Sequence, residues 1–144
     1  IRRFYNAKEN GEKKVICWGS GKPMREFLHV EDLGNACCYA LENWDPSLIN
    51  APVDNNGEKL LYLNVGTGID QSIKSVANMI AKLLDYKGKI EWDLSKPDGT
   101  PKKVLDITHL KKLGWEPKIS LEEGLERTIL DFKKELNENR LRTV

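Results

Sequence analysis

The stretch VICWGSGKPMREFLHVED, residues 15–32, changes its pattern several times within a short length of chain. It opens on a β-branched apolar run typical of a short strand, and a loop over residues 19–23 follows with two glycines. The apolar run at residues 26–30 predicts a second short strand. Glu31 and Asp32 then stand where acidic side chains complement the dipole at the start of a helix. A strand, a glycine loop, a strand and a helix in this order indicate an α/β fold.

The rest of the chain continues this alternation of strands and helices. Apolar side chains at helical spacing predict helices within residues 1–10, 33–44, 73–84, 107–113 and 120–136. In the second of these helices, Leu33 and Leu41 belong to the apolar stripe that is expected to face the core. The remaining expectations are a buried strand at residues 60–65, a strand at residues 89–93 and a surface loop at residues 45–59.

The composition excludes several classes of protein. The chain carries 23 basic and 22 acidic residues, for a net charge of +1, which gives no electrostatic footprint for nucleic acid or for an acidic membrane. No apolar run approaches the roughly 20 residues that a membrane span needs, and no signal peptide is recognisable. The sequence therefore predicts a cytoplasmic protein with no nucleic-acid partner and no membrane partner.

The cysteines and histidines offer no metal site. Cys17, Cys37 and Cys38 are expected to be reduced thiols that are buried as small apolar residues. His29 is expected to be hydrogen-bonded inside or at the edge of a sheet, and His109 to be exposed on a short helix. The two histidines lie far apart in the chain, and the spacing of zinc ligands does not occur.

The sequence also lacks the familiar catalytic and cofactor motifs. The glycine pairs at residues 19 and 21 and at residues 66 and 68 lack the third glycine of a G-x-G-x-x-G fingerprint, because Met24 and Gln71 stand in its place. The chain has no Tyr-x-x-x-Lys pair and no G-x-S-x-G elbow. These residues predict a binding unit without a catalytic set of its own.

Cationic and aromatic side chains around the loops are candidates for binding a diphosphate. Guanidinium groups pair with phosphate oxygens through charge-assisted hydrogen bonds worth about 1.5–3 kcal/mol each, and glycines let the backbone approach a ligand closely. Two alternatives stay open at this point, because arginines on a helix often form a solvated face and a tryptophan at a strand end is often part of the core. The candidates are Arg2, Arg3, Trp18, Arg25, Lys102 and Lys103.

Four segments of the chain together resemble the C-terminal part of the GDP-L-fucose synthases. REFLHVEDL and NVGTG are similar to the whole extended short-chain dehydrogenase/reductase superfamily of nucleotide-sugar enzymes, whereas SKPDGTPKK and WGSGKPMREF together point to the fucose synthase branch. The four segments are WGSGKPMREFLHVEDLGNA (18–36), LNVGTGIDQSI (63–73), SKPDGTPKKVLD (95–106) and LGWEPKISLEEGL (113–125).

The resemblance implies that residues 1–144 form the C-terminal substrate-binding domain of an NADP-binding Rossmann-fold enzyme, which is typically a homodimer. The family converts GDP-4-keto-6-deoxy-D-mannose to GDP-L-fucose, by epimerisation at C3 and C5 and reduction of the C4 ketone with NADPH. Its catalytic residues and its NADP site belong to segments upstream of Ile1. The resemblance therefore implies no catalytic residue in this chain, and the chain alone is expected to bind GDP-sugar at best.

Five substrate-binding residues of the family are carried over to positions where the motifs match. Arg3, Arg25 and Lys103 are expected to neutralise the diphosphate. Trp18 would offer its indole N–H and a flat ring face to the sugar or base. Asp98 would accept hydrogen bonds from guanine or from a ribose hydroxyl.

Two other interpretations compete with this one. The chain is alternatively part of another nucleotide-sugar epimerase, reductase or dehydratase that uses UDP- or dTDP-sugars, although SKPDGTP argues against that branch. The other alternative is a non-catalytic interaction module whose arginines meet an acidic partner, which would bind any polyanion with a steep salt dependence.

Overall fold

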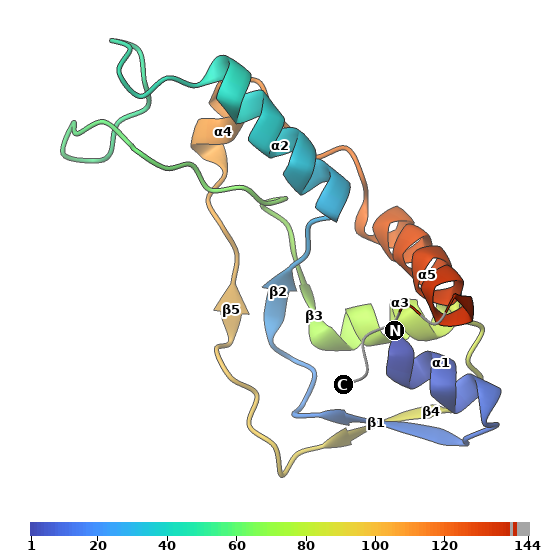
Figure 1. Ribbon diagram of the computed structural model, residues 1–144. Helices are drawn as coiled ribbons and strands as arrows, with labels where there is room; N and C mark the ends of the chain where they lie inside the picture. The colour runs from blue at the N-terminus through green and yellow to red at the C-terminus, as the bar shows by residue number, and fades with distance from the viewer. Residues whose placement is uncertain (139, 141–144) are drawn as a thin grey trace. The chain divides into compact units, whose positions relative to one another are not determined.

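A computed structural model describes residues 1–138 and residue 140 of the chain (Figure 1). Contacts divide the chain into two compact units, which are described separately below. Unit 1 consists of Ile1–Arg25, Gln71–Lys102 and Leu121–Val144, and unit 2 consists of Glu26–Asp70 and Lys103–Ser120. Among the described residues, no helix is both long and apolar enough to cross a membrane.

A pair of parallel strands stands at the centre of unit 1. Strand β1 (Lys14–Trp18) pairs with strand β4 (Lys89–Asp93) in a register that sets Val15 opposite Ile90 and Trp18 opposite Asp93. The helices of this unit are α1 (Arg2–Glu9), α3 (Ile73–Leu83) and α5 (Leu121–Asn137). Figure 1 shows α1 beside the strand pair.

The core of unit 1 lies between these helices and strands. The ring of Phe4 meets that of Tyr86 edge-on, with centroids 5.8 Å apart, and the Tyr86 hydroxyl donates to the carbonyl of Glu12 at 3.0 Å. Ser72 accepts a hydrogen bond from the backbone N–H of Ser75 at 3.0 Å, and so caps α3 as the sequence predicts. The buried core residues are Phe4, Ala7, Val15, Ala77, Ala81, Leu84, Tyr86 and Ile129.

Unit 2 has a smaller core around helices α2 (Val30–Asn43) and α4 (Thr108–Lys112). Its buried apolar residues are Ala36, Leu110 and Trp115. The indole N–H of Trp115 donates to the side chain of Asn35 at 2.9 Å. The buried carboxylate of Asp32 accepts the backbone N–H groups of residues 118 and 119, so it has the partners that a buried charge needs.

Glu26 connects three segments of unit 2. One oxygen of its carboxylate accepts the backbone N–H groups of Thr67 and Gly68, the latter at 2.6 Å. The other oxygen accepts the N–H of Leu105 at 2.8 Å. The side chain also occupies the space that a Cβ at Gly66 would need, so a larger residue there would displace the Glu26 carboxylate. The glutamate of the REFLHVEDL motif thus holds the NVGTG loop in place.

Three short strands complete the secondary structure. They are β2 (Met24–Glu26), β3 (Asp70–Ser72) and β5 (Lys102–Lys103), and they pair in the order β3-β2-β5. The division between the two units falls inside each of these strands. Parallel strands together with helices confirm the predicted α/β class.

Two strand predictions are wrong. Residues 60–65 form no strand, and Leu61 is 78% exposed. An apolar run becomes a strand only when another backbone pairs with it, and in the described part of the chain no strand pairs with this run. Strand β2 ends at Glu26 rather than at residue 30. His29 belongs to the start of α2 instead, because its side chain accepts the N–H of Glu31 and caps that helix.

Helix α2 buries only part of the apolar stripe that the sequence predicts for it. Asp32 and Ala36 are buried, whereas Leu41 is 87% exposed. The Asp32 carboxylate accepts the backbone N–H groups of residues 118 and 119, so a polar residue is buried on the inner face, whereas Leu33 of the predicted stripe is exposed. Cys37 and Cys38 are also exposed, so their expected burial is wrong; Cys17 is half-buried.

Candidate functional site

The glycine loop after β1 is fastened to the loop over residues 94–101. The Asp98 carboxylate accepts the backbone N–H of Ser20 on one oxygen and the Ser20 hydroxyl on the other, both at 2.6 Å. The hydroxyl and backbone hydrogen bonds from Ser20 hold the pKa of Asp98 below its usual value, with a smaller contribution from Lys22. The N–H of Gly19 also donates to the carbonyl of Asp93 at 3.0 Å.

Both glycines of this loop are required by the packing around them. Gly19 has φ of 75°, and a Cβ at this position would overlap the Asp98 carboxylate. Gly21 has φ of 72°, and a Cβ there would lie 2.6 Å from the ring of Trp92. A left-handed backbone with no room for a side chain is a conformation that glycine alone adopts easily. The two glycines therefore serve the loop's own geometry.

Trp18 is a surface residue and not part of the core. Its side chain is 67% exposed at the end of β1, and the Lys96 ammonium lies 5.7 Å from the centroid of its ring. This distance is typical of a cation–π contact. The alternative that Trp18 belongs to the core is therefore wrong.

One hollow of unit 1 is lined by Arg3, Glu12, Lys14, Val15, Ile16, Trp18 and Asp93. The Arg3 guanidinium donates to the carbonyl of Ile16 at 2.6 Å, which fixes the side chain across β1. A guanidinium that is fixed by a hydrogen bond and lies beside an exposed indole ring suits an anionic ligand that also carries a ring.

Arg25 lies beside the same loop that carries Asp98. Its guanidinium donates to the carbonyl of Met24 at 2.7 Å, and a Cβ at Gly99 would lie 3.8 Å from it. Unit 1 thus contains four of the five predicted site residues. The fifth, Lys103, is exposed in β5 and belongs to unit 2.

Two residues of this region escape sequence reasoning. Ser20 looks like an ordinary loop residue between two glycines, yet its backbone N–H and its hydroxyl both donate to the Asp98 carboxylate. Lys96 looks like a solubilising charge, yet it covers the ring of Trp18. Neither contact can be recognised from neighbouring residues, because the partners lie far apart in the sequence. Ser20 and Asp98, for example, are 78 residues apart.

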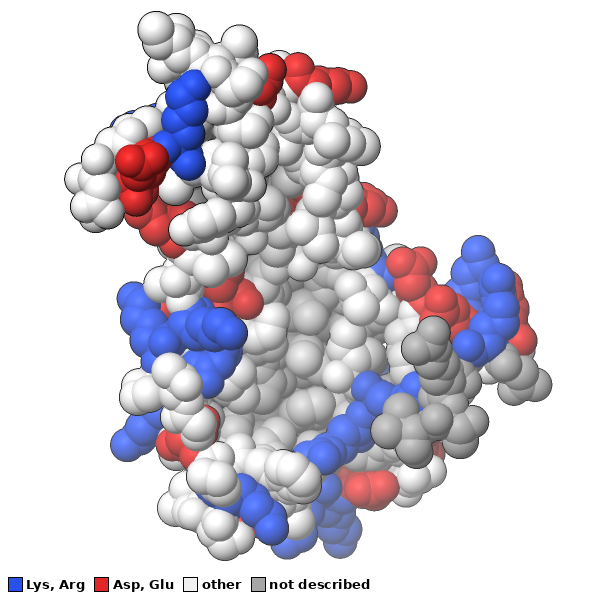
Figure 2. All heavy atoms as spheres, turned by 60° about the vertical axis from the view of Figure 1, so that its left-hand side comes forward, with Lys and Arg blue, Asp and Glu red and all other residues white. Residues whose placement is uncertain are grey.

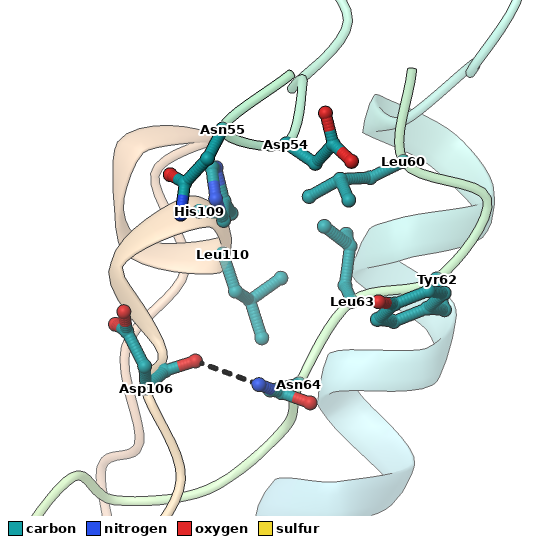
Figure 3. A pocket seen from close by; sticks show the side chains of 9 residues that line it. All are labelled: Asp54, Asn55, Leu60, Tyr62, Leu63, Asn64, Asp106, His109 and Leu110. Atoms are coloured by element: carbon teal, nitrogen blue, oxygen red, sulfur yellow. Dashed lines mark hydrogen bonds between the residues drawn. The ribbon is translucent and has the colours of Figure 1, made fainter. Parts of the chain in front are cut away.

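A second cavity, of about 260 Å³, lies within unit 2 (Figure 3). The Asp54 carboxylate accepts the N–H groups of Asn56 and Glu58, and Asp106 accepts that of Thr108. The backbone N–H groups of Glu58 and Asn56 lower the pKa of Asp54, and the side-chain and backbone hydrogen bonds from Thr108 lower the pKa of Asp106. The lining residues are Asp54, Asn55, Leu60, Tyr62, Leu63, Asn64, Asp106, His109 and Leu110.

The groups around this second cavity stabilise the local backbone. Its carboxylates cap turns and a helix start, and the amide of Asn64 donates to the carbonyl of Asp106 at 3.0 Å (Figure 3). His109, expected to be exposed, is half-buried in the cavity wall. Within residues 1–138 and 140, no cluster of metal-ligating side chains occurs. The hollow beside Trp18 is therefore the stronger candidate for a binding site.

Figure 2 shows side chains of both charges on one face of the molecule. Basic and acidic side chains are interspersed there, and neither sign covers the face. This distribution agrees with the net charge of +1. It gives no support to an interaction module that attracts polyanions in general.

Comparisons with known proteins agree with these features. Residues 1–51 match the NAD dependent epimerase/dehydratase family. The chain is 44% identical over 142 residues to the GDP-L-fucose synthase of Escherichia coli (strain K12), an alignment that covers 99% of this chain and 42% of that protein. It spans only 35% to 42% of the length of the first curated relatives that it matches.

Two solved structures from Campylobacter jejuni share the fold. A GDP-6-OMe-4-keto-L-xylo-heptose reductase has a TM-score of 0.80 at 30% identity, over 93% of this chain and 46% of that one. A GDP-mannoheptose C4 reductase with NADP bound has a TM-score of 0.76 at 30% identity, over 92% of this chain and 42% of that one.

These similarities confirm the resemblance found in the sequence motifs. The chain is related to the nucleotide-sugar epimerases and reductases of the extended short-chain dehydrogenase/reductase superfamily. Within that superfamily it is a homologue of the GDP-L-fucose synthases and corresponds to their C-terminal part.

Proposed function

We propose that this chain is the GDP-sugar-binding part of a GDP-L-fucose synthase, which converts GDP-4-keto-6-deoxy-D-mannose to GDP-L-fucose by 3,5-epimerisation and NADPH-dependent 4-reduction. The names of the relatives support the reaction, and the loop motifs support the nucleotide-sugar. The single observation that carries the proposal is the hollow in which the exposed ring of Trp18 and the guanidinium of Arg3 lie together. A homodimer in the cytoplasm is part of the same proposal.

The residues of this chain do not fit the NADP cofactor. A dinucleotide fingerprint needs glycines that leave open space for a pyrophosphate to approach the backbone. Here the space at Gly21 is filled by Trp92, and the space at Gly66 is filled by Glu26. We therefore assign NADP to the portion of the enzyme that the chain does not span, and we derive no hydride or proton transfer from residues of this chain.

Within the proposed site, the cations and the aromatic ring have separate tasks. Arg3 and Arg25, both in unit 1, contact the diphosphate. Each charge-assisted bond to phosphate is worth about 1.5–3 kcal/mol. The ring of Trp18 stacks on the sugar or the base, and Lys96 yields its place over the ring to the ligand.

Calorimetric titration of the chain with GDP-mannose and with UDP-glucose tests the proposal. We expect binding of GDP-mannose in preference to UDP-glucose, and Arg25→Ala should weaken it about 10- to 100-fold. Arg127→Ala is the matched control, because Arg127 pairs with Glu123 on α5 and is not one of the predicted site residues. A preference for UDP-glucose would instead favour a UDP-sugar epimerase. Binding of neither ligand would contradict the proposal for this chain.

A further inference from the structure

We propose that residues 61–66 and the outward face of helix α2 form one docking surface, which joins unit 2 to the portion of the enzyme that the chain does not span. Residues 61–66 add a strand to the edge of a β-sheet in that portion, and α2 packs against the same portion. The inference rests on the function proposed above, since it takes the chain to be one part of a longer GDP-L-fucose synthase. The outward face of α2 consists of Val30, Leu33, Gly34, Cys37 and Leu41.

The first support is that residues 61–66 have the composition of a strand but no strand partner. In the described part of the chain, their backbone N–H and C=O groups take part in no backbone-to-backbone hydrogen bond. An apolar run with unpaired backbone groups is a template on which another strand can pair. The partner that fits this run is therefore the edge of a β-sheet.

The side chains of this run already alternate as they do in a strand. Leu63 and Val65 are half-buried and pack against the core that contains Ala36 of α2, whereas Tyr62 and Asn64 are exposed. A period of two is the pattern of a strand with one covered face. The helix that covers this face is already in place, so a neighbouring backbone would complete the strand.

The second support is that α2 is apolar on two sides. Its inner side is buried, with Ala36 fully inside the core of unit 2. On the outward face the three large apolar side chains are all exposed, Leu41 most of all. Gly34 and Cys37 keep the middle of this face small, so that another surface can approach it closely. A helix that is apolar on both sides is typical of the interior of a larger protein.

The size of the relatives points to the partner that covers this surface. The chain spans 35% to 42% of the length of the first curated relatives, so more than half of such an enzyme lies outside it. The epimerase/dehydratase family model matches residues 1–51, a range that includes α2. A strand with its covering helix is the unit from which α/β sheets are built. The surface therefore fits the open edge of a sheet in the rest of the enzyme, rather than a second copy of this chain.

Amide hydrogen exchange, followed by mass spectrometry, tests the strand in this chain and in the intact GDP-L-fucose synthase of Escherichia coli. In the chain alone we expect residues 61–66 to exchange within about tenfold of the rate of an unstructured peptide. In the intact E. coli enzyme the aligned residues should exchange at least about a hundredfold more slowly, because they pair as a strand. Protection in the chain alone would overturn the inference, and protection that grows with chain concentration would assign the surface to a second copy. Unprotected residues in the intact enzyme would overturn it as well.

Substitution of Leu41 by lysine tests the helix face. In this chain Leu41→Lys should shift the melting temperature by less than about 1 °C, since the side chain is already in solvent. A lysine at the aligned position of the intact E. coli enzyme should lower it by at least about 4 °C, because a charge is then buried at the contact. Leu130→Lys, also at an exposed leucine, is the matched control and should be close to neutral in both proteins. An intact enzyme that tolerates the first lysine as well as the control would show that α2 is not part of the surface.

The two proposals fail in different ways, because these measurements use no nucleotide-sugar. If GDP-mannose binds to the chain but residues 61–66 are protected without a partner, the proposed function stands and the docking surface fails. If the chain binds no GDP-mannose but the exchange pattern is the expected one, the proposed binding site fails and the docking surface stands.

Discussion

The carboxylate of Asp98 occupies the space that a side chain at Gly19 would fill. The position of the Asp98 carboxylate therefore requires glycine at residue 19, although the two residues lie in different motifs of the sequence. The contact joins the end of β1 to the loop after β4, which are the two segments that bound the exposed ring of Trp18.

Substitution of Gly19 by alanine should displace this contact. A left-handed φ costs an alanine about 1–2 kcal/mol, and the new Cβ would also push the Asp98 carboxylate away. Gly11→Ala is the matched control, because Gly11 has φ of 65° with nothing within 4 Å of its Cβ position. Chemical denaturation should show a larger loss of unfolding free energy for Gly19→Ala than for Gly11→Ala. Equal losses would show that the overlap with Asp98 does not matter.

The core of unit 1 should be sensitive to truncation on one face of α5 only. Ile129 is 4% exposed and packs in the core, whereas its neighbour Leu130 is 66% exposed. We expect Ile129→Ala to lower the free energy of unfolding by about 2–5 kcal/mol, because it leaves a cavity. Leu130→Ala should change it by less than about 0.5 kcal/mol. Thermal or urea unfolding of both variants checks this prediction, which comparable effects would contradict.

Removal of a single oxygen from Glu26 should destabilise unit 2. Both carboxylate oxygens accept backbone N–H groups, so in Glu26→Gln the amide nitrogen would face an N–H donor. A lost bond of this kind costs about 1–3 kcal/mol. Glu42→Gln, on the exposed side of α2, is the control and should be close to neutral. Thermal unfolding that is unchanged in Glu26→Gln would show that the carboxylate does not organise the NVGTG loop.

The contact between Asp98 and Ser20 should persist into the acidic range. Hydrogen bonds from Ser20 lower the pKa of Asp98 in the folded chain below its value in the unfolded chain. The contact therefore contributes stability above the unfolded pKa, near 3.8, and this contribution is lost as pH falls through the lower folded pKa. The difference in Ser20 amide protection against hydrogen exchange between the unaltered chain and Asp98→Ala should remain at pH 5 and vanish well below pH 4. A difference that vanished already at pH 5 would contradict the direction of the shift.

Elements whose signals are local could be predicted from the sequence. The run KIEWD forms β4 over the predicted residues, and Ser72 caps α3 where a polar residue precedes an apolar helical pattern. Gly114 follows the end of α4 with φ of 105°, as a glycine stop after a helix predicts. In each case the residues that determine the structure lie within a few positions of it.

Features that depend on distant partners could not be predicted. Residues 60–65 have the composition of a strand, but a strand needs a second backbone to pair with. The burial of Asp32 on α2 is matched by the backbone N–H groups of residues 118 and 119 that it accepts, which no periodicity reveals. For the same reason the sequence indicated Asp98 as a site residue through its motif but not its contact with Ser20.

The central claim, that a GDP-sugar binds beside Trp18, is tested most directly by NMR of the tryptophan indole N–H groups during a titration with GDP-mannose. The chain has four tryptophans, and Trp18→Phe identifies the signal of Trp18. We predict a saturable shift of the Trp18 signal that is larger than the shifts of the other three and that is reduced in Arg3→Ala. A Trp18 signal that stays in place up to millimolar GDP-mannose would contradict the claim.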